Sequence, residues 1–157
     1  MKEIRGAFDA RGRRFTVAAA GFNQIVVEKL VEGALACFRA HGVAEDDLSV
    51  VWVPGAFELP FVARKLAGSG LVDAVVCLGA VVRGETAHFD FVAGEAARGI
   101  ADAATETGVP ILFGVLTTEN MSQALDRAGG KHGNKGWDAA MAAMEMVSLI
   151  DQLPQKE

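Results

Sequence analysis

The sequence of 157 residues has no tyrosine, two cysteines and four prolines, and it contains no long hydrophobic run. Apolar segments such as Ala74–Val82 are far shorter than the roughly 20 residues that cross a bilayer, so we expect no membrane span. The polar N-terminus, Met1–Arg14, lacks the apolar centre of a signal peptide. Cys37 and Cys77 stand in apolar stretches without CxxC or Cys/His spacing. This favours buried reduced thiols over a disulfide or metal site, and it predicts a cytoplasmic protein.

Several catalytic signatures are also missing. No GxGxxG follows the first apolar run, and GxxxxGK[ST], HExxH and GxSxG do not occur. The sequence therefore gives no support for dinucleotide redox chemistry, nucleotide hydrolysis, zinc catalysis or a serine-hydrolase elbow. The net charge of −5 and the pI near 5.2 argue against nucleic-acid partners and anionic membranes.

The composition is that of a folded domain with a slight apolar excess. Hydrophobic residues make up 51% of the chain, charged residues 22%, and the mean hydropathy is +0.26. These values argue against disorder, and the length predicts one domain over residues 1–157. The apolar excess also indicates surface that is hidden in contacts between subunits.

Short apolar runs alternate with longer amphipathic ones. The expected strands are Arg14–Ala20, Leu48–Val53, Ala74–Val82 and Val109–Leu116; the expected helices are Gln24–His41, Glu58–Ala67, Ala87–Thr107, Thr118–Ala128 and Trp137–Leu149. Glycines exclude a regular helix through Gly129–Gly136. This alternation predicts an α/β fold, a parallel sheet covered by helices on both faces.

Ligands of such sheets bind at the carboxyl ends of the strands. We therefore expect the segments that follow the strands to converge: Gly21–Gln24, Pro54–Leu59, Val82–Asp90 and Phe113–Asn120. In the third of them, Gly84, Glu85 and Thr86 form a strand-to-helix turn that suits an anion. His88 follows, and imidazole exchanges protons near neutral pH. A structural or surface role is the alternative for this histidine.

The other candidates allow two interpretations each. Phe22 and Phe57 lie in predicted loops, where they either complete the core or stack on a flat heterocycle. Glu58 begins a helix, where it either favours the helix dipole or accepts hydrogen bonds from ligand hydroxyls. Arg127 opens a basic, glycine-rich stretch, which is either a solvated loop or a phosphate-recognition element. Together they limit the ligand class without naming a reaction.

A set of these segments resembles the lumazine synthase (6,7-dimethyl-8-ribityllumazine synthase) family. The resemblance runs from about residue 4 to residue 150, and it is carried in consistent order by Gly21–Asn23, Val53–Pro60, Gly79–Asp90, Phe113–Asn120 and Arg127–Gly136. One position departs from the family pattern, because Gly21 stands where the family commonly has arginine. A glycine gives a freer backbone beside the aromatic residue that follows.

The resemblance implies a flavodoxin-like three-layer sandwich with a four-stranded parallel sheet. It also implies a transferase reaction. Members join 5-amino-6-(D-ribitylamino)uracil to 3,4-dihydroxy-2-butanone 4-phosphate, and the products are 6,7-dimethyl-8-ribityllumazine, phosphate and water. This is the penultimate step of riboflavin biosynthesis, and it needs no metal or organic cofactor.

The resemblance also implies residue roles. His88 transfers protons, and Glu85, Thr86 and Arg127 bind the butanone phosphate, the first two through backbone N–H groups. The ribitylaminouracil side of the site comprises Phe22, Ala56, Phe57, Glu58, Ala80, Val81, Val82, Phe113 and Lys135. Phe113 closes the pocket from a neighbouring subunit, so the site lies between subunits.

The family forms homopentamers, and the compact Gly129–Gly136 favours a shell of sixty subunits. Glu3–Phe8 is expected to add a strand to a neighbour's sheet, and association with riboflavin synthase is a further hypothesis. Three alternatives remain: an archaeal-type riboflavin synthase of the same fold, a catalytically silent lumazine- or flavin-binding protein, and a structural shell. The phosphate elements argue against the first, and retention of His88 and Arg127 argues against the second.

Overall fold

Four parallel strands form the centre of the molecule. The computed structural model describes residues 1–156, and its main sheet has the order β2-β1-β3-β4. The strands are β1 (Phe15–Ala20), β2 (Leu48–Val53), β3 (Ala74–Val82) and β4 (Ile111–Thr118). All of β1 and nearly all of β3 are buried, as expected for the two central strands of a sheet covered on both faces. The predicted α/β class and the four-stranded parallel sheet are confirmed.

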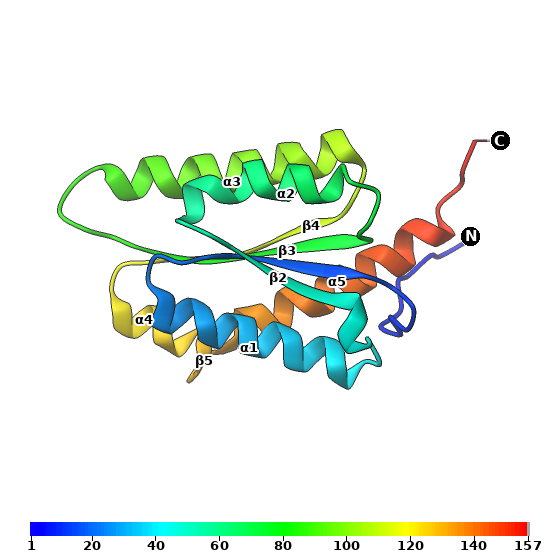
Figure 1. The fold of residues 1–157 in the computed structure, drawn as a ribbon, viewed down its shortest axis with the longest axis horizontal. Helices are drawn as coiled ribbons and strands as arrows, with labels where there is room; N and C mark the ends of the chain where they lie inside the picture. The colour runs from blue at the N-terminus through cyan, green and yellow to red at the C-terminus, as the bar shows by residue number, and fades with distance from the viewer. Residues whose placement is uncertain (157) are drawn as a thin grey trace.

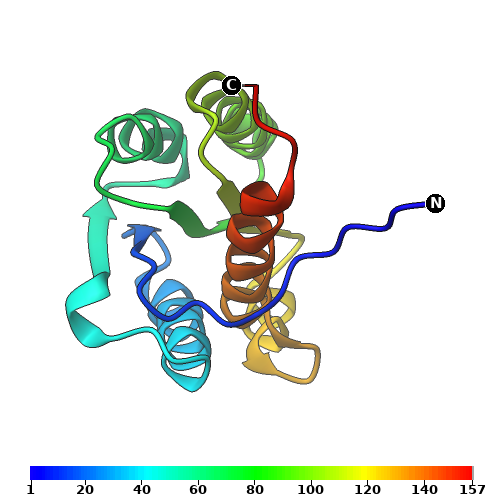
Figure 2. The ribbon, with the colours of Figure 1, turned by 90° about the vertical axis from the view of Figure 1, so that its right-hand side faces the viewer.

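Helices cover both faces of the sheet, which gives three layers (Figure 1). One face carries α1 (Gln24–Ala40), the short α4 (Met121–Asp126) and α5 (Lys135–Gln152); the other carries α2 (Leu59–Ala67) and α3 (His88–Thr107). The end-on view in Figure 2 separates the two helical layers. Each interface has its own apolar core, built around Leu30 and Phe38 on the first face and around Leu59 and Ile100 on the second.

Two boundaries near β4 differ from the sequence prediction. The strand is shifted by two residues toward the C-terminus, because Pro110 has no N–H to contribute and only its carbonyl accepts a bond, from the N–H of Val75 over 2.9 Å. The following helix is shorter than predicted. The side chain of Asn120 accepts a hydrogen bond from the N–H of Gln123 over 2.9 Å and so begins α4 at Met121.

The glycine-rich segment before α5 contains two short antiparallel strands, β5 (Ala128–Gly130) and β6 (Gly133–Asn134). Asn134 then caps α5, since its Oδ1 accepts from the N–H groups of Gly136 (2.8 Å) and Trp137 (3.1 Å). The predicted exclusion of helix through residue 136 was therefore wrong for its last two residues. Gly136 meets a packing requirement, because a Cβ there would overlap the backbone of Leu30.

The N-terminal segment forms no strand within this chain and extends away from the body (Figure 2). Residues 5–7 are attached to α5 by two hydrogen bonds, from the N–H of Ala7 to Oγ of Ser148 over 2.9 Å and from Nε2 of Gln152 to the carbonyl oxygen of Arg5 over 2.9 Å. Short 3₁₀ turns, Glu45–Asp47 and Ala56–Glu58, precede β2 and α2. Within residues 1–156, no helix is both long enough and apolar enough to span a bilayer.

Both cysteines are free and buried, which confirms the prediction from their apolar surroundings. Burial raises the pKa of the Cys77 thiol to about 12. Burial, with the nearby charge of Asp138 as a smaller cause, raises the pKa of Cys37 to about 11. Neither thiol is a reactive nucleophile at neutral pH.

Candidate active site

The loops after β1, β2 and β3 meet at one end of the sheet around a cavity of about 760 Å³. This is a normal volume for a site that binds a small organic ligand. Among the predicted site residues, those that line the cavity are Phe22, Ala56, Phe57, Glu58, Ala80, Val81, Val82, Thr86 and His88. The expected convergence is therefore confirmed for three of the strand ends.

Two phenylalanine rings are exposed to solvent at this cavity. Phe22 is 73% exposed and Phe57 is 58% exposed, although both side chains are fully apolar. The backbone holds the first of them firmly, because the N–H of Gly21 donates to the carbonyl oxygen of Val53 (2.7 Å) and that of Phe22 to Pro54 (3.0 Å). These bonds continue the β1–β2 pairing past the strand ends. A completed core would have covered the rings, so their exposure favours the stacking interpretation.

The loop between β3 and α3 supplies the polar wall. Gly84 and Thr86 line the cavity, whereas the side chain of Glu85 is exposed and does not. Within residues 1–156, the N–H groups of these three residues have no hydrogen-bond acceptor. His88 is the first residue of α3, and its N–H lies 3.4 Å from Oγ1 of Thr86. Free N–H groups beside a helix start are suited to an anion.

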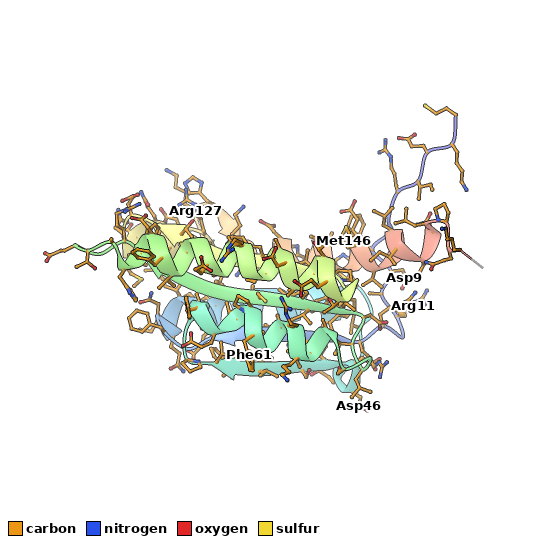
Figure 3. All side chains as sticks on the ribbon, turned by 90° about the horizontal axis from the view of Figure 1, so that it is seen from above. Asp9, Arg11, Asp46, Phe61, Arg127 and Met146 are labelled. Carbon is orange, nitrogen blue, oxygen red and sulfur yellow. The ribbon has the colours of Figure 1, made fainter. Side chains whose placement is uncertain are left out.

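Besides Glu85, three predicted residues lie outside this cavity. Arg127, labelled in Figure 3, directly follows α4. Its Nη1 donates to the carbonyl oxygen of Gln123 over 3.1 Å. Phe113 lies in the middle of the edge strand β4 and is 46% exposed, so the segment Phe113–Asn120 does not line the cavity as predicted. Nζ of Lys135 lies 3.7 Å from Oδ2 of Asp138.

The side chains that line the cavity include no lysine or arginine among residues 1–156. A phosphate at the loop Gly84–Thr86 would therefore meet N–H dipoles, the Thr86 hydroxyl and His88 from this chain. Backbone dipoles alone compensate only part of the charge of a phosphate dianion, and sites for transferred phosphates normally include a cation. Within one chain, the cavity therefore lacks the cation that a phosphate normally meets.

Some lining residues were not predicted from the sequence. Phe89, Phe91 and Val92 face the cavity from the first turns of α3. Together with His88 they show helical spacing, which could have identified them once the start of the helix was known. Asn23 was also missed as a site residue, although it lines the cavity between Phe22 and α1.

The family model described as 6,7-dimethyl-8-ribityllumazine synthase matches residues 12–151. The chain belongs to the lumazine synthase family. A relative in the family, the 6,7-dimethyl-8-ribityllumazine synthase of Chlorobium luteolum, is 56% identical over 149 residues, which cover 95% of this chain and 96% of the relative. The protein of the same name from Clostridium kluyveri is 50% identical over 153 residues, with 98% and 99% of the two chains covered. The resemblance inferred from the sequence is confirmed.

Proposed function

We propose that this protein is a 6,7-dimethyl-8-ribityllumazine synthase, a transferase of riboflavin biosynthesis. It condenses 5-amino-6-(D-ribitylamino)uracil with 3,4-dihydroxy-2-butanone 4-phosphate and releases phosphate and water. The observation that carries the proposal is the cavity itself, where bare aromatic rings, unpaired N–H groups and His88 meet in a member of this family. Relatives that bear this name cover nearly the whole chain.

Each substrate has a place in the cavity. The pyrimidine stacks on Phe22 against the apolar wall of Ala80, Val81 and Val82, and Ala56, Phe57 and Glu58 hold the ribityl chain. The butanone phosphate lies on the N–H groups of Glu85 and Thr86. Holding both reactants together can supply about 7–11 kcal/mol of the barrier in favourable cases.

The reaction needs proton transfers rather than a covalent protein intermediate. The 5-amino group attacks the ketone, and loss of water gives an imine. Phosphate is then eliminated, and the ring closes with a second loss of water. Protons move between neighbouring atoms in each step, and in this proposal His88 transfers them. Its position in the cavity lining, next to the phosphate loop (Gly84–Thr86), supports this role. Backbone donors and a cation assist the departure of phosphate.

The missing cation comes from a second copy of the chain in this proposal. In a homopentamer, Arg127, Phe113 and Lys135 of one subunit complete the cavity of its neighbour, with Arg127 on the phosphate and Phe113 over the pyrimidine. The exposure of Phe113 on an edge strand supports this arrangement. Glu3–Phe8 pairs with a neighbouring sheet, and pentamers assemble into a sixty-subunit cytoplasmic shell with which riboflavin synthase associates. Light scattering that shows only pentamers at micromolar concentration would contradict the shell.

Incubation with both substrates tests the function. Lumazine absorbance and phosphate release should rise together, in equal amounts. Binding of the pyrimidine without product would instead favour a silent binding protein of the same fold. Neither binding nor product would favour a purely structural shell, and product from lumazine alone would favour a riboflavin synthase.

A further inference from the structure

Arg83 is fixed to the neighbouring strand where the phosphate loop begins. Its N–H donates to the carbonyl oxygen of Thr118 over 2.8 Å, which extends the β3–β4 pairing by one residue beyond Val82. The loop that follows therefore leaves the sheet from a fixed point beside the end of β4.

The side chain of Arg83 joins that point to the first turn of α3. Its Nε lies 3.0 Å from Oε2 of Glu119, directly after β4, and its Nη2 lies 3.5 Å from Oδ1 of Asp90 on α3. The guanidinium carbon lies 4.3 Å from the centre of the Phe89 ring, a cation–π distance. One cation thus connects both ends of the loop, while Arg83 itself is not part of the cavity lining.

Between these attachments the loop has little support of its own. Gly84, Glu85 and Thr86 are exposed, and throughout residues 1–156 nothing accepts a hydrogen bond from their N–H groups. The direction of these N–H groups thus depends on how firmly the two ends of the loop are held. Arg83 holds both ends.

We propose that Arg83 is a positioning residue for the butanone phosphate, which it serves through the loop rather than by contact. The proposal rests on the function proposed above.

Steady-state kinetics on the intact oligomer test this role. In Arg83→Gln, the KM for the butanone phosphate should rise about tenfold, the effect of losing one hydrogen bond to a charged group, while the KM for the pyrimidine stays unchanged. Arg83→Lys should recover part of the loss, because lysine keeps the positive charge but cannot bind Glu119 and Asp90 at once as the planar guanidinium does. Arg98→Gln is the matched control, since it breaks an ion pair with Glu95 on α3 away from the cavity.

Glu119→Gln separates positioning from direct contact. If Arg83 acts through the loop, this variant weakens phosphate recognition as Arg83→Gln does. If Arg83 is itself a phosphate ligand, freeing it from Glu119 should leave recognition unchanged or strengthen it, and that result would overturn the proposal. Equal increases of both KM values in Arg83→Gln would also overturn it, because they would indicate a general structural role.

Calorimetric binding of inorganic phosphate keeps the test independent of turnover. Weaker binding by Arg83→Gln than by the unmodified protein supports the positioning role even if no lumazine forms, in which case only the proposed function fails. Equal phosphate binding by the two proteins, or no binding by either, contradicts the positioning role.

Discussion

Nδ2 of Asn23 donates a hydrogen bond to the carbonyl oxygen of Ala80 over 2.8 Å and so links the loop after β1 to β3. The pairing between β1 and β3 ends at Ala19 and Leu78, so the asparagine supplies a donor where β1 no longer provides one. Asn23 has a left-handed backbone, with φ at 61°, a conformation that asparagine tolerates better than most residues. This bond ties the loop that carries Phe22 to β3.

Asn23→Ala should lower the free energy of unfolding by about 1 kcal/mol for the lost hydrogen bond and by about 1–2 kcal/mol more for the left-handed backbone. Asn23→Gly removes the bond without the backbone strain, so it should be the milder variant. Both should raise the KM for the pyrimidine. Urea unfolding and initial rates check this, and equal destabilisation by the two variants would contradict the backbone argument.

Phe22→Ala should weaken binding of the pyrimidine about tenfold, since stacking of a base on an aromatic ring contributes about 1–3 kcal/mol. Its effect on folding should stay within about 0.5 kcal/mol, because the ring is largely exposed. Ile25→Ala is the control, as Ile25 is 74% exposed and lies outside the cavity lining. Titration of each variant with the pyrimidine should separate them; a similar loss in both would argue against stacking.

His88→Ala should lower kcat by about 100-fold, the lower range for loss of a general acid–base group, and leave both substrates bound. Turnover should still exceed that of a protein-free mixture, because the remaining cavity holds the reactants together. Single-turnover absorbance measurements provide the test. A variant that binds both substrates yet reacts no faster than free solution would mean that the histidine does more than transfer protons.

The buried thiols should make the protein less stable at alkaline pH. The pKa values of Cys37 and Cys77 are raised to about 11 and about 12, from an ordinary value of 9.0. Above pH 9 the unfolded chain releases thiol protons that the folded chain retains, so the free energy of unfolding should fall as the pH rises toward 11. Below pH 9 both thiols stay protonated in the folded and the unfolded chain, so none of this stability is lost.

The Cys77→Ala variant should show a shallower decline over that pH range in denaturant titrations. Native protein at pH 8 should resist thiol reagents, and urea should expose both groups to labelling. A decline of the same slope in the variant, or rapid labelling of the folded protein, would contradict the assigned burial.

Much of the fold could be predicted from the sequence because its signals are local. Ala74–Val82 is apolar throughout, and the strand has those bounds. Asn120 and Asn134 carried a usable capping signal before α4 and α5, although the predicted boundaries did not use it. The relations of Asn23 to Ala80 and of Arg83 to Glu119 join residues 57 and 36 positions apart, so no local pattern could have indicated them.

The candidate site divides in the same way. Residues directly after β1, β2 and β3 could be predicted, because parallel strands bring their carboxyl ends to one edge. Phe113 could not be placed from the strand rule. Phe113 is part of the edge strand β4 rather than of the loop that follows it, and its side chain is exposed. Its proposed partner is another subunit.

The proposal that lumazine forms in a cavity shared by two copies of the chain is tested most directly by mixing variants. Phe22→Ala with His88→Ala in one chain disables the cavity, and Arg127→Ala in another removes the cation that a neighbour would supply. Each homo-oligomer should be nearly inactive, whereas co-expressed mixed oligomers should contain intact cavities and regain lumazine formation with equal phosphate release. Mixed oligomers no more active than the average of the two parents would show that each chain works with its own Arg127, and would contradict the shared site.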